Sequence, residues 1–187
     1  TMAEDAQAML ATLREQYARR RVLVGVDRLD YSKGLPQRMR AFRTLLDRYP
    51  ENRNSATLIQ VAAPSREDVD AYGDIRRQLE GLCGAINGDF GEIDWMPIRY
   101  IHRTVARKRV PGLYRAARVG LVTPLRDGMN LVAKEFVAAQ DPENPGVLVL
   151  SRFAGAAEQL PDALLVNPYD TQATADAIQL ALHMPLE

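Results

Sequence analysis

Short apolar runs recur along the chain and are separated by longer amphipathic stretches. Six of these runs are rich in β-branched and aliphatic residues and have the length of strands: 22–26, 57–62, 98–101, 119–123, 146–150 and 164–166. Runs that are apolar throughout, rather than alternating with polar residues, are typical of parallel strands covered on both faces. The pattern therefore predicts a buried parallel sheet.

Helical periodicity fills most of the intervals between these runs. Apolar residues recur every three or four positions in three segments: 35–49, 69–82 and 129–139. A leading helix is expected within residues 1–20, and a last helix is expected to begin near Asp170, a favourable N-cap residue. Ser65 and Asp68 resemble a capping box at the start of the second segment.

Strands and helices alternate throughout, which defines an α/β protein. Because crossovers between parallel strands are right-handed, we expect a single Rossmann-like domain over residues 1–187, with a doubly wound, mostly parallel six-stranded sheet. A chain of 187 residues has the length of one domain. Ligands of such sheets bind beyond the carboxyl ends of the strands, so a site is expected in the loops that follow them.

Composition narrows the classes of partner. The chain has 24 Lys and Arg against 24 Asp and Glu, and this balance argues against binding to nucleic acid or to a membrane surface. It has no apolar stretch near the roughly 18 residues of a membrane-spanning helix and no signal-peptide pattern, so a cytoplasmic protein is expected.

Cysteine and histidine are too sparse for a clustered metal site. Cys83 is the only cysteine, which excludes an intramolecular disulfide and favours a core or loop thiol. His102 and His183 have no neighbouring carboxylates or cysteines in the sequence, so neither is predicted to bind a metal.

Two segments rich in Gly, Pro and Asn interrupt the pattern, at 84–97 and 140–147. The first is the longest segment without periodicity. It is interpreted either as a mobile or binding loop or as a solvated connector.

Two cations follow the first predicted strand, in the stretch DRLDYSKG at 27–34. This loop has neither G-x-G-x-x-G nor G-x-x-x-x-G-K-[ST], which disfavours a dehydrogenase or a P-loop kinase. Arg28 and Lys33 between a strand and a helix would suit a phosphate or a pyrophosphate. The alternative is that they only pair with Asp27 and Asp30.

A second candidate loop, RDGMNLVAKE at 126–135, leads into a helix. Asp127 can cap that helix, Gly128 allows close approach of a ligand, and the amides of 129–132 are the unsatisfied donors of a helix start, which binds anions. Because a carboxylate repels phosphate, Asp127 is expected to bind sugar hydroxyls instead.

Glu135 lies eight residues beyond Asp127, about 12 Å along a helix, which is a suitable span from a hexose across a diphosphate to a ribose. Taken alone, Glu135 is better interpreted as a surface helix acid paired with a neighbour. Combined with Arg28 and Lys33, it favours a nucleotide-sugar site.

Five stretches together resemble the trehalose-6-phosphate synthase family of retaining glycosyltransferases: VGVDRLDYSKG, APSREDVDAYGDIR, VGLVTPLRDGMNLVAKEFVAAQ, GVLVLSRFAGAAEQL and LLVNPYDTQATADAI. The resemblance runs from about residue 22 to about residue 182. It implies the C-terminal, donor-binding half of a two-domain GT-B fold. The family transfers glucose from a nucleotide diphosphate glucose, commonly UDP-glucose, to glucose 6-phosphate.

The resemblance also implies residue roles. Arg28, Lys33 and Asp127 would take part in the transfer. The implied contacts are Arg28 and Lys33 with the diphosphate, Asp127 and the amides of Gly128, Met129 and Asn130 with glucose, the amides of Leu131 and Val132 with phosphate, Glu135 with ribose, Ile101 and Val105 with the base, and Arg66 with the acceptor phosphate.

The resemblance implies that no metal or other cofactor is needed, so two cations and a helix start would stabilise the leaving diphosphate. The expected partners are the nucleotide-sugar donor, the glucose 6-phosphate acceptor and an N-terminal domain, in a homo-oligomeric full-length protein. The chain alone is expected to bind nucleotide without turnover. The alternatives are a related transferase, such as glucosylglycerol-phosphate synthase, and a non-catalytic module that senses nucleotide sugar.

Overall fold

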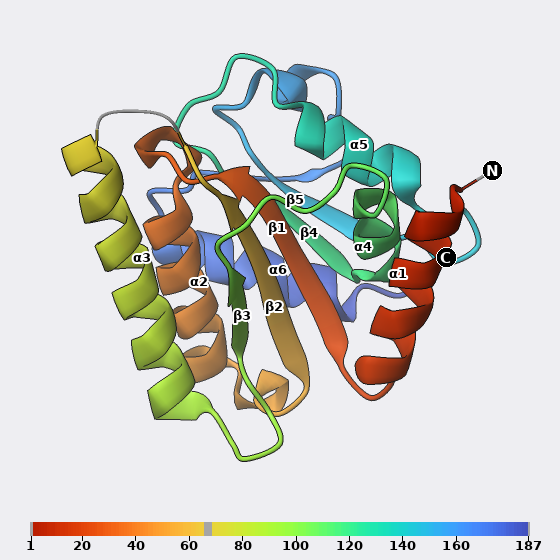
Figure 1. Ribbon diagram of the computed structural model, residues 1–187, viewed down its shortest axis with the longest axis horizontal. Helices are drawn as coiled ribbons and strands as arrows, with labels where there is room; N and C mark the ends of the chain where they lie inside the picture. The colour runs from red at the N-terminus through yellow and green to blue at the C-terminus, as the bar shows by residue number, and fades with distance from the viewer. Residues whose placement is uncertain (1, 66–68, 187) are drawn as a thin grey trace.

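The computed structural model describes residues 2–65 and 69–186 and has one sheet between two layers of helices (Figure 1). The strands are β1 Arg21–Arg28, β2 Ala56–Ala63, β3 Ile98–Ile101, β4 Val119–Val122, β5 Val147–Ser151 and β6 Leu164–Val166. The helices are α1 Glu4–Gln16, α2 Leu35–Arg48, α3 Val69–Phe90, α4 Val110–Ala116, α5 Leu131–Ala139 and α6 Thr171–His183. All six predicted strands are confirmed.

The strand order is β3-β2-β1-β4-β5-β6, and every pairing is parallel. This confirms the predicted doubly wound α/β fold. From β1 the chain adds strands in one direction as far as β3 and then returns to the other side of β1 with β4. The order therefore reverses between β1 and β4, the place where open α/β sheets bind ligands at their carboxyl edge.

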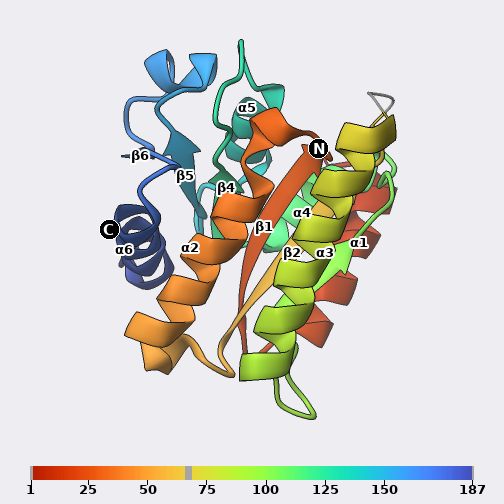
Figure 2. The same cartoon turned by 90° about the vertical axis from the view of Figure 1, so that its left-hand side faces the viewer.

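Helices cover both faces of the sheet (Figure 2). The buried residues of α2, α3 and α6 form one core cluster with the sheet, and those of α1, α4 and α5 form the other. On α2, Leu35, Met39 and Phe42 are fully buried at the spacing of one helix face. Across the ranges 2–65 and 69–186, no helix is both long enough and apolar enough to cross a membrane.

Helices α1 and α4 pack closely at Gly112. A Cβ atom at this position would collide with the carbonyl oxygen of Ala6. Gly112→Ala is therefore expected to lower the free energy of unfolding by about 1–3 kcal/mol through overpacking. Urea denaturation measures the change.

Gly84 provides the matched control for Gly112. It lies inside α3, where a Cβ atom would have no neighbour within 4 Å. Gly84→Ala is expected to raise the stability by about 0.5–1 kcal/mol, since alanine has the better helix propensity. Equal effects of the two substitutions would contradict close packing of α1 on α4.

Both interpretations of 84–97, as a mobile or binding loop and as a solvated connector, are wrong over 84–90, which is helical. Helix α3 continues through its glycines to Phe90, because Cys83 and Ile86 are buried against the core. Beyond it, Trp95 is 3 % exposed and donates a hydrogen bond from Nε1 to the carbonyl oxygen of Ala56 at 3.1 Å. The segment packs at the amino end of β2, opposite the carboxyl edge.

Helix ends agree only in part with the sequence pattern. Asp170 accepts a hydrogen bond from the amide of Ala173 at 3.0 Å, which confirms the predicted cap of α6. The predicted capping box falls on Asp68, outside the described residues. The sequence pattern did not predict the seven-residue α4, whose start contains Pro111 and Gly112.

Candidate functional site

The loops that follow β1 and β4 meet at the carboxyl edge where the strand order reverses. The carbonyl oxygen of Ser32 accepts hydrogen bonds from the amides of Leu125 at 2.7 Å and Arg126 at 3.4 Å. Gly34 has φ 67°, and a Cβ atom there would lie 2.5 Å from the carbonyl oxygen of Thr123. Glycine thus permits the close approach of two loops that are distant in sequence.

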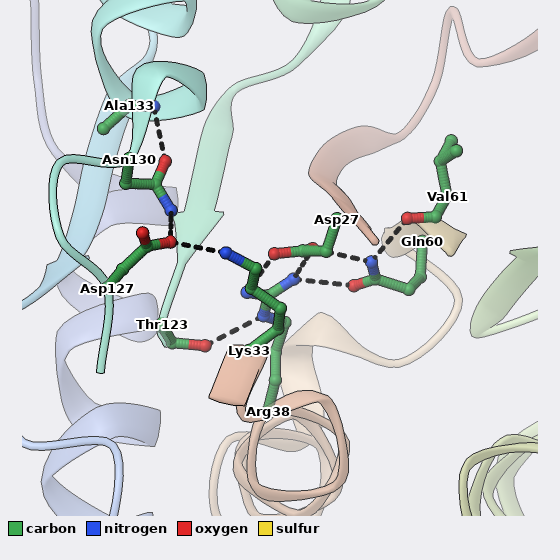
Figure 3. Close-up of polar contacts among 9 residues, drawn as sticks. All are labelled: Asp27, Lys33, Arg38, Gln60, Val61, Thr123, Asp127, Asn130 and Ala133. Atoms are coloured by element: carbon green, nitrogen blue, oxygen red, sulfur yellow. Dashed lines mark hydrogen bonds and ion pairs between the residues drawn. The ribbon is translucent and has the colours of Figure 1, made fainter. Parts of the chain in front are cut away.

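An ion pair joins the two loops (Figure 3). Lys33 Nζ donates to Asp127 Oδ2 at 2.6 Å, and Asn130 Nδ2 donates to the same oxygen at 3.0 Å. The Lys33 and Asp127 side chains are 18 % and 17 % exposed. The pair is thus partly shielded from water while still open to a ligand, and the site unites a predicted cation with a predicted carboxylate.

Arg28 is the last residue of β1, at the start of the loop that contains Lys33. Its guanidinium donates to Asp30 at 2.9 Å, and its side chain is 54 % exposed. Burial disfavours ionisation of Asp30, but hydrogen bonds from Ser32 and Arg28 outweigh it and hold the pKa of Asp30 below its ordinary value. The predicted pairing with Asp27 or Asp30 is therefore confirmed for Arg28 and wrong for Lys33, which pairs with Asp127.

Helix α5 begins at Leu131, and its cap is Asn130 rather than Asp127. Asn130 has φ 66°, and its Oδ1 accepts from the amide of Ala133 at 3.1 Å. Asp127 does not cap the helix; its Oδ2 instead accepts hydrogen bonds from Lys33 and Asn130. Asp127 and Glu135 are consequently not on one continuous helix, and the helical span predicted between them does not apply.

The backbone before α5 offers a row of free donors. The amides of residues 128–132 have no hydrogen-bond partner among the residues that the structure describes. The loop is held from behind, where its carbonyl oxygens at Asp127 and Met129 accept from Gly155 and Ala156 at 3.1 and 2.8 Å. In front, a Cβ atom on Gly128 would meet nothing within 4 Å. Such a fixed row of amides can bind an anion or sugar oxygens.

A buried polar cluster supports the site from below (Figure 3). Arg38, 1 % exposed, donates to Asp27 at 2.5 and 3.3 Å, to Gln60 at 2.9 Å and to Thr123 at 2.9 Å. Asp27 also accepts from Gln60 at 3.0 Å. The cluster connects β1, β2 and the end of β4, and sequence reasoning missed it. The available signal was that Arg38 falls on the apolar face of its helix.

A cavity of about 520 Å³ lies beside the amide row, between α4, α5 and the loop after β3. Three predicted donor-binding residues line it: Val105, Val132 and Glu135. Ile101 is half-buried against the same core cluster but is not part of the lining. Arg66 lies outside the described residues.

The remaining titratable residues singled out in the sequence have structural surroundings. Burial, followed by the nearby charge of Glu80, raises the pKa of Cys83 to about 12. His102 lies within hydrogen-bonding distance of Tyr72 and of the Ala62 carbonyl, and His183 contacts Asn52. Within the described part of the chain, no three His, Cys, Asp or Glu residues are grouped so that they could hold a metal ion.

Known proteins match both the sequence and the fold. The trehalose-6-phosphate synthase of Sinorhizobium fredii is 56 % identical over 174 residues, which cover 93 % of this chain and 38 % of the relative. The Burkholderia xenovorans α,α-trehalose-phosphate synthase (UDP-forming), solved with glucose-6-phosphate, superposes with a TM-score of 0.94 at 56 % identity, over 98 % of this chain and 42 % of that one. The Escherichia coli structure bound with UDP-2-fluoro glucose gives a TM-score of 0.92 at 50 % identity, over 97 % and 42 %.

The chain spans less than half the length of these relatives, and its sheet corresponds to the C-terminal half of their GT-B fold. Residues 2–187 match glycosyltransferase family 20. With the fold and the sequence in agreement, the chain belongs to glycosyltransferase family 20.

Proposed function

We propose that the chain binds a nucleotide diphosphate glucose and is the donor-binding half of a trehalose-6-phosphate synthase. The full-length enzyme would transfer glucose from UDP-glucose to glucose 6-phosphate, giving trehalose 6-phosphate. The observation that carries this proposal is the row of unpartnered amides at 128–132 beside the Lys33–Asp127 pair. Similarity to a structure bound with UDP-2-fluoro glucose supports it.

The donor's parts match the groups along the site. The diphosphate would lie against Arg28, Lys33 and the amides of Leu131 and Val132. Glucose would lie at Asp127, whose Oδ1 has no hydrogen-bond partner within the described ranges, and at the amides of 128–130. The nucleoside would enter the cavity lined by Val105 and Glu135.

In this arrangement transfer depends on charge stabilisation. When the glycosidic bond to the diphosphate breaks, negative charge grows on the leaving phosphate oxygen. Fixed amide dipoles and two cations stabilise that charge more than they stabilise the bound donor, which lowers the barrier. We therefore propose that donor binding needs no divalent metal.

The acceptor side would come from outside this chain, apart from Arg66, which we propose reaches the phosphate of glucose 6-phosphate. The chain alone is then expected to bind donor without turnover. A product assay on the isolated chain tests this part of the proposal: formation of trehalose 6-phosphate would contradict it.

Calorimetric titration of the chain with UDP, GDP and ADP in the absence of divalent metal tests the donor site. Binding of at least one nucleotide is expected, and Glu135→Ala should weaken it about tenfold or more, because hydrogen bonds to a charged group contribute about 1.5–3 kcal/mol. Glu143→Ala removes an exposed carboxylate from the loop after α5 and serves as the control. The proposal fails if wild-type chain binds none of the three nucleotides.

A further inference from the structure

Tyr114 on α4 has a buried ring and an unsatisfied hydroxyl. The residue is 2 % exposed, and its ring packs edge-on against Phe136 of α5, with ring centroids 5.9 Å apart. Gln140 donates to its backbone carbonyl at 3.1 Å. The ring position is therefore fixed by its packing against α5.

Tyr114 and Glu135 line the same cavity. Tyr114 is part of the cavity wall, and its hydroxyl has no hydrogen-bond partner in the described ranges. Among the described residues, the side-chain oxygens that are both fully buried and without a hydrogen-bond partner are those of Ser65 and Tyr100. The unpartnered Tyr114 oxygen is not one of them, so it is not fully buried. Buried tyrosine hydroxyls usually have a partner, and here that partner would be a ligand.

Tyr114 and Glu135 approach the cavity from different helices. Burial raises the pKa of the Tyr114 hydroxyl, and the charges of Glu135 and Asp27 raise it further. A donor and an acceptor facing one space suit a vicinal diol, whose hydroxyl groups both donate and accept hydrogen bonds. The apolar remainder of the lining, including Val26, Val110 and Pro111, suits a flat base.

We propose that Tyr114 is a further donor-binding residue, whose hydroxyl hydrogen-bonds the ribose diol together with Glu135. This inference rests on the proposed function of the site. It assigns to α4, the helix that the sequence pattern did not predict, a direct part in holding the nucleoside.

Tyr114→Phe tests the proposal, because it removes one oxygen and retains the packing against Phe136. Calorimetry with UDP is expected to show binding weakened about three- to tenfold, the loss of one hydrogen bond. With 2′,3′-dideoxyuridine diphosphate, which lacks the diol, wild-type and variant are expected to bind alike. Thermal unfolding of the variant should match that of wild type, since no protein hydrogen bond is lost.

Tyr100→Phe is the matched control. Its hydroxyl is also unpartnered, but the residue packs on the opposite face of the sheet and does not line the cavity. It should leave UDP affinity unchanged. An equal loss for both nucleotides in Tyr114→Phe, or no loss with UDP, would overturn the ribose contact while leaving the donor site standing. If wild-type chain bound no nucleotide, the proposed function itself would fail.

Discussion

Arg38→Met is expected to destabilise the fold by about 3–5 kcal/mol, a large part of the total stability of an ordinary domain. The substitution retains a long side chain but removes the cation that faces Asp27. The carboxylate of Asp27, 4 % exposed, is then left with Gln60 as its remaining hydrogen-bond donor in Figure 3. An uncompensated buried charge accounts for most of the expected loss, which urea denaturation would measure.

The double variant Asp27→Asn with Arg38→Met separates charge from packing. Removing both charges should restore part of the stability, because the desolvation penalty of the lone carboxylate disappears. If the two substitutions were simply additive, or if Arg38→Met alone lost less than about 1 kcal/mol, the cluster would not have the structural importance assigned to it.

The sheet was predictable because each strand is a short apolar run between turn residues, and burial on both faces leaves few polar positions to obscure it. The two helices that were predicted wrongly or missed, α3 and α4, are both determined by tertiary packing. Helix α3 runs through Gly84 and Gly88 because buried contacts at Ile86 override low helix propensity. The short α4 is determined by its packing against α1, which has no local signal in the sequence.

The candidate site, like the fold, was predictable where the signal is local and was missed where tertiary contacts decide. The loop residues Lys33 and Asp127 were recognisable from their positions after strands, whereas their pairing across 94 positions depends on the tertiary fold. The Arg38 cluster and Tyr114 were missed for a related reason. A buried arginine and a buried tyrosine are distinguished from ordinary helix residues only by what faces them, and that is set by strands and helices elsewhere in the chain.

Lys33→Ala is expected to weaken nucleoside diphosphate binding about 100-fold or more, equivalent to about 2.8 kcal/mol. Two effects combine. The phosphate loses a charge-assisted hydrogen bond, and Asp127 loses the cation that lies 2.6 Å from its carboxylate. At about 5 Å and an effective dielectric constant of about 20, a bare carboxylate repels a phosphate charge by about 3 kcal/mol before screening.

The second effect can be isolated because Asp127→Asn removes the repulsion without removing the side chain. In the Lys33→Ala background, Asp127→Asn should recover about tenfold in UDP affinity. In the wild-type background, the same substitution should weaken UDP-glucose more than UDP, since Asp127 is assigned to the sugar. Arg14→Ala, which removes a cation from α1 at the far end of the sheet, should leave both affinities unchanged. A double variant that binds UDP no better than Lys33→Ala would show that Lys33 acts on the phosphate alone and that its pairing with Asp127 has no role in donor binding.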